Sequence, residues 1–216
     1  MKFLVFDTER TGLPKSKSAN PEDTYLFPYV VQLSWLVFNS GTNKIEFLKD
    51  KIIRLPHHVK IPEQATKIHG ITQERMLAEG QPIENVLNTF LRDISSCTYM
   101  VGHNISFDKT MIEVECIRNK CKRLSDYRKI SFCTMIRGRT VCCIERENPF
   151  NGKMEYKYPK LIELHEYLFN TTPKNLHNSL IDILICFRCF YSLIYNTDPM
   201  ETNPQFKRYC KTFCCL

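Results

Sequence analysis

The sequence predicts an α/β fold in which a mixed sheet of five strands is flanked by helices. Residues 2–6 are largely apolar and are typical of a short buried strand. Residues 29–39 are rich in β-branched and aromatic side chains, and a Ser-Gly-Thr-Asn turn separates them from residues 44–55, which indicates a hairpin. From residue 62 onward, helical and strand patterns alternate, as expected for a sheet covered by helices.

The segment that follows the hairpin predicts three helices. Pro62 begins the first, since proline is tolerated in the first turn, where its missing N–H would have no partner, and His69-Gly70 ends it. A second short helix begins at Thr72. The third spans residues 82–96, whose apolar side chains recur at helical spacing on one buried face: Ile83, Val86, Leu87, Phe90, Leu91 and Ile94.

The rest of the chain completes one domain. The length of 216 residues suits one sizeable core, and no linker-like composition divides the chain. We predict a domain over residues 1–195, with an irregular polar insertion at 138–157 and a C-terminal tail at 196–216. Within the domain we expect, in order, strand 99–103, helix 106–121, strand 129–136 and helices at about 159–169 and 177–195.

Eleven cysteines in a chain without a secretory signal pattern predict reduced thiols and an intracellular location, cytoplasmic or nuclear. No apolar run reaches the roughly 20 residues that a membrane span requires. Cys186 and Cys189 have the spacing of a zinc half-site, but such a pair on an apolar helix also shares one buried face, and the second interpretation is favoured. Partners for a zinc site would be Cys142, Cys143, Cys210, Cys214 or Cys215.

Two acids end the first strand. Side chains two apart on a strand share a face, so Asp7 and Glu9 point together and Thr8 points away. Adjacent carboxylates repel each other, and oxygen-preferring divalent cations relieve that repulsion. The pair therefore predicts a metal site, although an acidic turn that breaks at Gly12 is the simpler interpretation.

Further motifs favour the metal site. The chain resembles the DEDDh, or DnaQ-like, 3′→5′ exonuclease family of the RNase H-like superfamily over about residues 2–195. One residue departs from the family pattern, since Arg10 stands where a small or hydroxyl residue is usual. The three motifs that carry the resemblance are Asp7-Thr8-Glu9, Gly102-His103-Asn104-Ile105-Ser106-Phe107-Asp108 and His177-Asn178-Ser179-Leu180-Ile181-Asp182.

The resemblance implies an RNase H-like fold and catalysis with two Mg²⁺ ions, for which Mn²⁺ can substitute. Residues matching Asp7, Glu9 and Asp182 hold one ion in the family, while Asp7 bridges to a second that Asp108 supports. Four carboxylates carry enough negative charge to offset two dications.

A histidine base is also implied. His177 is expected to accept a proton from the attacking water, whereas a surface histidine at a helix start is the alternative. Its five-residue separation from Asp182 would turn it away on a continuous helix, so we expect it on the loop before the helix. The resemblance further implies substrate contacts, with Phe107 equally compatible with a core position: Thr8, Leu13, Ile68, His69 and Phe107.

Basic residues favour a polyanionic partner. The net charge is +7, and residues 118–139 contain eight basic side chains and one acid, interleaved with aromatic residues. A solvated basic face is the default interpretation, and guidance of a single strand is the functional one.

We therefore predict a metal-dependent exonuclease that releases nucleoside 5′-monophosphates from the 3′ ends of single-stranded DNA or RNA. The alternative is a binding module that kept the fold and lost catalysis. The sequence leaves open DNA against RNA, single strand against duplex, the process served and the oligomeric state. DNA repair and proofreading both fit, and proofreading would require a polymerase as partner.

Overall fold

The computed structural model describes residues 1–16, 18–174 and 176–213, and its centre is the mixed five-stranded sheet that the sequence predicts. The strands lie in the order β3-β2-β1-β4-β5. β1 pairs antiparallel with β2 and parallel with β4, and β4 pairs parallel with β5. The strands are β1 (Lys2–Arg10), β2 (Val30–Asn39), β3 (Lys44–Ile52), β4 (Tyr99–Gly102) and β5 (Ile130–Cys133).

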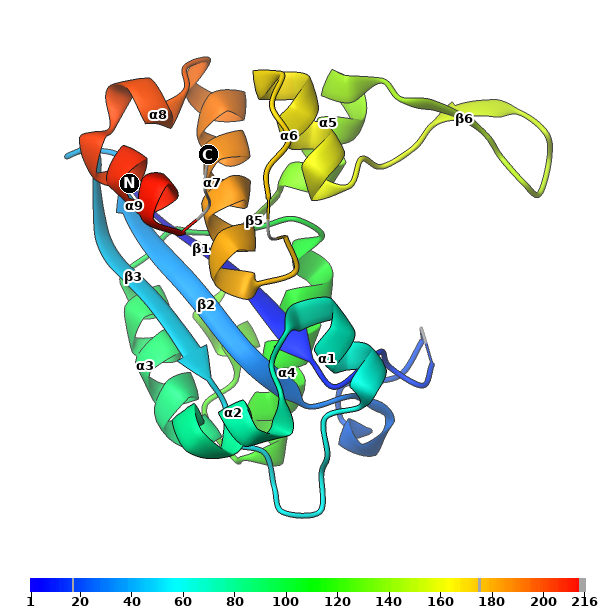
Figure 1. The fold of residues 1–216 in the computed structure, drawn as a ribbon, viewed down its shortest axis with the longest axis vertical. Helices are drawn as coiled ribbons and strands as arrows, with labels where there is room; N and C mark the ends of the chain where they lie inside the picture. Colours follow the sequence, from blue (N-terminus) through cyan, green and yellow to red (C-terminus); the bar gives the residue numbers. More distant parts are fainter. Residues whose placement is uncertain (17, 175, 214–216) are drawn as a thin grey trace.

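Helices cover both faces of this sheet (Figure 1). α7 lies in front of it in this view, and α3 and α4 lie behind. Alternate β1 side chains separate the two cores: Leu4 and Phe6 pack with α3 and α4, and Phe3 and Val5 with α7. The helices are α1 (Glu63–His69), α2 (Gln73–Glu79), α3 (Ile83–Ser95), α4 (Ile105–Arg118), α5 (Thr134–Cys142), α6 (Leu161–Phe169), α7 (Ser179–Tyr195), α8 (Pro199–Thr202) and α9 (Pro204–Phe213), with 3₁₀ turns η1 (Thr24–Leu26) and η2 (Leu124–Tyr127).

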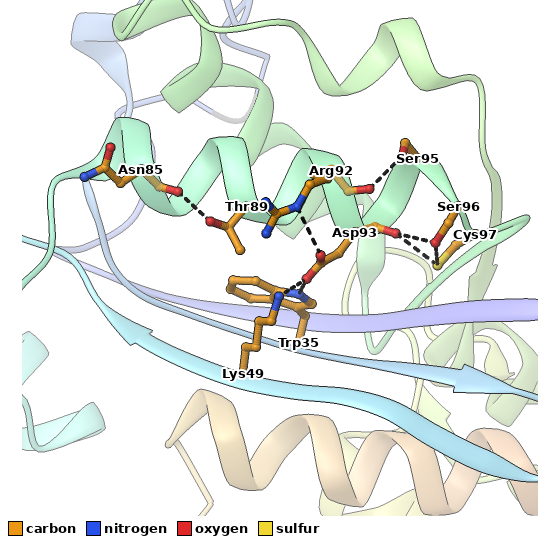
Figure 2. Close-up of polar contacts among 9 residues, drawn as sticks. All are labelled: Trp35, Lys49, Asn85, Thr89, Arg92, Asp93, Ser95, Ser96 and Cys97. Carbon is orange, nitrogen blue, oxygen red and sulfur yellow. Dashed lines mark hydrogen bonds and ion pairs between the residues drawn. The ribbon is translucent and has the colours of Figure 1, made fainter.

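A buried polar cluster fastens α3 to the sheet (Figure 2). The indole N–H of Trp35 donates to Asp93 at 2.9 Å, and the Lys49 ammonium pairs with the same oxygen at 2.5 Å. Phe90 packs edge-on against Trp35 with 5.5 Å between ring centroids. Because Asp93 is only 7% exposed, its carboxylate depends on these two donors in place of water.

The segment predicted as an irregular insertion has regular structure. The expected strand 129–136 ends at Cys133, and α5 begins at Thr134, whose buried hydroxyl lies 3.3 Å from the Gly102 carbonyl and so holds the turn against β4. The remainder forms a hairpin that extends from the body of the molecule (Figure 1). Its strands are β6 (Glu145–Glu147) and β7 (Met154–Tyr156), joined by a turn in which Gly152 has a positive φ of 68°.

The predicted tail also differs from the structure, because its described residues form α8 and α9. Phe206 and Cys210 are fully buried in the same core as α7. The Gln205 side chain bonds both the N–H and the carbonyl of Ile45, which satisfies an edge position of β3. Cys186 and Cys189 lie in the α7 core, as the favoured interpretation expects, while Cys214 and Cys215 lie outside the described residues. No helix in the described part of the chain is both long and apolar enough to cross a membrane.

Candidate active site

Three elements bring the predicted acids to one edge of the sheet. β1 and β4 run parallel, so their carboxyl ends lie side by side, and α4 and α7 begin next to them. The start of α4 passes so close to β4 that a Cβ at Gly102 would lie 3.1 Å from the Ile105 side chain. Asn104 takes a left-handed conformation, with φ at 65°, to begin the helix.

Asp7, Glu9 and Asp182 form a candidate metal centre. Each offers an oxygen within 4.8 Å of the others, and this is the one such group of His, Cys, Asp or Glu among residues 1–16, 18–174 and 176–213. The Oδ1 atom of Asp182 is buried and has no hydrogen-bond partner among the described residues. A buried acceptor without a donor costs free energy unless a cation or water satisfies it. The three side chains therefore fit a hard divalent cation.

The electrostatics of the four acids agree with this fit. Burial, followed by repulsion from Asp108, Asp182 and Glu9, raises the pKa of Asp7 well above its ordinary value. Burial, reinforced by Asp182, raises the pKa of Glu9 to about 8, and burial raises that of Asp182 to about 7. Burial also raises the pKa of Asp108, to about 6, against the opposing effects of Arg10 and Thr8. Removing the mutual repulsion requires protons or cations.

Asp108 is held differently from the other three acids. Its Oδ1 accepts hydrogen bonds from the Thr8 hydroxyl at 2.6 Å and from the Thr8 N–H at 3.2 Å. Thr8 is 1% exposed, so its side chain positions Asp108, and a substrate contact at Thr8 stays a prediction. The sequence showed that Thr8 points away from Asp7 and Glu9, but not that Asp108 would lie on that side.

The first turn of α7 is fastened to β1. The Ser179 hydroxyl donates to the Asp7 carbonyl at 2.7 Å, and the Ser179 N–H lies 3.4 Å from the Gln32 side-chain oxygen. The Gln32 amide in turn donates to Asp50 at 2.7 Å. This chain of bonds fixes the start of α7, and so Asp182, relative to Asp7. Neither Ser179 nor Gln32 was predicted from the sequence, although a glutamine inside the apolar β2 run was a detectable signal.

His177 precedes α7, as its spacing predicts. It has a positive φ of 71° and an exposed side chain, and the helix begins two residues later at Ser179. Its backbone also lowers the pKa of Asp182 through a hydrogen bond, which places the loop against the acid cluster. Its role as a base stays a prediction.

Three of the predicted nucleotide contacts, Leu13, Ile68 and His69, line a cavity of about 430 Å³ beside Glu9 and Arg10. Leu13 and Ile68 are 77% and 60% exposed, so both offer apolar surface to a ligand. His69 is buried, and its Nδ1 accepts from the Ile71 N–H at 3.1 Å, so the proton lies on Nε2. No described residue lies in hydrogen-bond geometry with that buried Nε2, but a hydrogen bond with the Arg10 backbone raises the pKa of His69 against the larger, opposite effect of burial. His69 therefore lies in the wall of the cavity with its Nε2 buried.

Phe107 has features of both a core residue and a substrate contact. It is partly buried against the core of α3 and α4, and it also lines a cavity of about 250 Å³ with Asp7, Arg10 and Asp108. The Arg10 guanidinium lies over its ring, 4.3 Å from the centroid. Phe107 thus supports the site from the core and carries a cation on its outer face.

Several basic side chains of residues 118–139 make contacts within the protein. The Arg118 guanidinium is 10% exposed and donates to Glu115 and to the carbonyls of residues 24, 27 and 28. Lys129 donates to the carbonyls of residues 95 and 97, and Arg123 pairs with Glu22. Arg118 and Lys129 are thus engaged in the fold, whereas the Arg123–Glu22 pair is exposed and contributes little to stability. Guidance of a nucleic-acid strand by the rest of this segment stays a prediction.

Comparisons with known proteins agree with this architecture. Residues 4–190 match the family model RNase_T, described as exonuclease. A comparison with curated proteins gave no match. Among solved structures, one of exonuclease I aligns with a TM-score of 0.69 at 16% identity, over 98% of this chain and 43% of that one.

Two structures of the E. coli enzyme with DNA are also similar. Its complex with a dT13 oligonucleotide aligns with a TM-score of 0.64 at 16% identity, over 98% of this chain and 42% of that one. Its zinc-bound complex with single-stranded DNA aligns with a TM-score of 0.63 at 17% identity, over 98% and 43%. The chain thus spans less than half the length of these structures. Because the family model matches most of the sequence and the fold is shared with exonuclease I, the chain belongs to the DnaQ-like exonuclease family, with its RNase H-like fold.

Proposed function

We propose that the protein is a DEDDh-type 3′→5′ exonuclease that releases nucleoside 5′-monophosphates from the 3′ ends of single-stranded nucleic acid. The observation that carries this proposal is the gathering of Asp7, Glu9 and Asp182 oxygens within 4.8 Å, with an unpartnered Asp182 oxygen among them. Carboxylates from distant segments with strongly raised pKa values are typical of a functional site. Membership of an exonuclease family gives that site its reaction class.

The four carboxylates would bind the metal ions. Asp7, Glu9 and Asp182 would hold one Mg²⁺ or Mn²⁺ ion, and Asp7 and Asp108 would support a second. When bound, the ions supply activation of the attacking water and charge stabilisation for the leaving oxygen. Thr8 holds Asp108 in place with the two hydrogen bonds described above.

Substrate binding and proton transfer fall to the surrounding side chains. His69, in the wall of the cavity of about 430 Å³, contacts the terminal nucleotide. Leu13 and Ile68 contact its base or sugar through their exposed apolar surfaces. His177, exposed on the loop before α7, accepts the proton released by the attacking water.

A single-stranded substrate is supported by the similarity to E. coli exonuclease I, whose zinc-bound structure is a complex with single-stranded DNA. Either DNA or RNA fits the side chains named here, because apolar and stacking contacts tolerate any base. A panel of matched DNA and RNA strands separates the two.

The decisive experiment compares a linear single strand labelled at its 3′ end with an internally labelled circular single strand. Each strand is incubated with Mg²⁺ and with excess chelator. The expected result is release of labelled mononucleotide from the linear strand alone, abolished by chelator and by Asp7→Asn. Asp23→Asn, at a position that makes no capping hydrogen bond, is the matched control and should keep full activity. Binding of both strands without release would support an inactive binding module and contradict the proposal.

His177→Ala tests the proton acceptor separately. Loss of a general base typically costs 10²–10⁴-fold in rate, so the variant should lose activity on that order while still binding the labelled strand. A rate within twofold of the unmodified protein would remove His177 from the reaction.

A further inference from the structure

Arg10 is a cation built into the acidic cluster. It is the last residue of β1, and the register with β2 shifts between Glu9 and Arg10, so this residue leaves the regular alternation of the strand. Such bulges re-aim a side chain and are frequent beside active sites. The Arg10 side chain is 23% exposed, and its Nη1 lies 3.9 Å from Asp108 Oδ1. Its guanidinium lies over the Phe107 ring at 4.3 Å, which fixes its plane.

The contacts of Arg10 make the two sides of the cluster unequal. On one side, Asp182 has a buried oxygen without any donor. On the other, Asp108 accepts two hydrogen bonds from Thr8 and faces the guanidinium. The group with metal-ligand spacing contains Asp182 and omits Asp108. The Arg10 charge also lowers the pKa of Asp7 and of Glu9, but its one ion pair is with Asp108, and no cation among the described residues lowers the pKa of Asp182.

We propose that in the free protein Arg10 takes the place of a second cation beside Asp108, so that the protein alone binds one divalent ion, between Asp7, Glu9 and Asp182. The second ion is admitted when a substrate phosphate draws the guanidinium away from Asp108. Arginine prefers the planar, two-point contact that a phosphate offers, and at 3.9 Å its pairing with Asp108 lies outside hydrogen-bond distance. This inference rests on the proposed function, because it assigns order to the ions of the same site.

The test counts bound ions without measuring catalysis. Isothermal titration of the metal-free protein with Mn²⁺ should give one site per chain. Arg10→Ser, which introduces the small hydroxyl residue usual in the family, should give two sites, or a second site at least tenfold tighter than in the unmodified protein. Arg10→Lys keeps the charge and should keep one site. Arg92→Ser removes the same charge from an exposed position on α3 and should also keep one site.

A second titration includes an oligonucleotide whose last linkage is a hydrolysis-resistant phosphorothioate. Its presence should raise the stoichiometry of the unmodified protein from one to two. Two equal sites in the free unmodified protein, or an Arg10→Ser titration identical to it, would overturn the role of Arg10 while leaving the nuclease proposal intact. No Mn²⁺ binding at all, or binding unaffected by Asp182→Asn, would instead overturn the proposed function itself.

Discussion

Replacement of Thr8 by valine tests how Asp108 is held. Valine keeps the size, the branching at Cβ and the strand preference of threonine, and it removes only the hydroxyl. That hydroxyl donates to Asp108 Oδ1 over 2.6 Å in a site where Thr8 is 1% exposed, so water does not replace the lost donor. The Thr8 N–H remains as a second donor to the same oxygen at 3.2 Å.

The magnitude follows from the charge of the acceptor. A hydrogen bond to a charged group contributes about 1.5–3 kcal/mol, and the remaining N–H donor places the expected loss of unfolding free energy near the lower end, at about 1.5–2 kcal/mol at pH 8. Burial raises the pKa of Asp108 to about 6, so at pH 5 the carboxyl group is mostly neutral in the folded protein. The loss at pH 5 should then fall to about 1 kcal/mol or less, as for a neutral pair.

Urea unfolding of the metal-free protein at pH 8 and pH 5 measures both values. Thr89→Val is the matched control, because its hydroxyl bonds the Asn85 carbonyl on the exposed face of α3 (Figure 2) and its removal should cost less than about 0.5 kcal/mol. Since the Thr8 bonds lower the pKa of Asp108, the variant should also shift the acid limb of nuclease activity to higher pH. Equal losses at the two pH values, or a loss at pH 8 no larger than that of the control, would refute this account.

Three further predictions concern charge and burial. The pKa of Asp182 is raised to about 7 in the folded protein, so the cost of burying this group begins near its unfolded pKa of about 4, grows as the pH rises and is complete above about pH 7. Asp182→Asn should therefore stabilise the metal-free protein at pH 8 by about 1–3 kcal/mol, have little effect at pH 4, and abolish the Mn²⁺-induced rise in Tm. Asp93→Ala leaves the buried Trp35 indole N–H without its acceptor, so it should lower the free energy of unfolding in urea by about 2–4 kcal/mol. The Mn²⁺ stoichiometry should not change, and a change would contradict a purely structural role. Burial lowers the pKa of His165 to about 4, below that of the unfolded chain, so stability should fall as the pH drops from 6.5 toward 4; His165→Gln should make this decline shallower, and identical slopes would exclude His165 as a contributor.

Features that depend on near neighbours in the chain were predictable. The alternation of a strand placed Asp7 and Glu9 on one face, and the five-residue spacing placed His177 before the helix that carries Asp182. The five strands and the main helices followed from apolar periodicity, and the family motifs matched the observed fold. Each of these inferences needs only backbone geometry over a few residues.

Features that depend on distant partners were not predictable. Thr8 and Asp108 are 100 positions apart, and Ser179 and Asp7 are 172 apart, so no local pattern announces either bond. Arg118 looked like part of a solvated basic face until the fold placed backbone carbonyls and Glu115 around it. The hairpin β6–β7 and helices α8 and α9 were missed because short elements gain most of their stability from packing and pairing, not from local propensity.

The sequence by itself determined which side chains are candidates for the chemistry, because residue type and short-range spacing decide the face on which a carboxylate or histidine emerges. Only the tertiary structure decided the state of each group. It leaves an oxygen of Asp182 without a donor, gives Asp108 two donors from Thr8, and sets Arg10 against Asp108 on the Phe107 ring. The physical reason is that charge, protonation and hydrogen bonding in a buried site depend on everything within a few ångströms, and folding brings those neighbours together from remote parts of the chain.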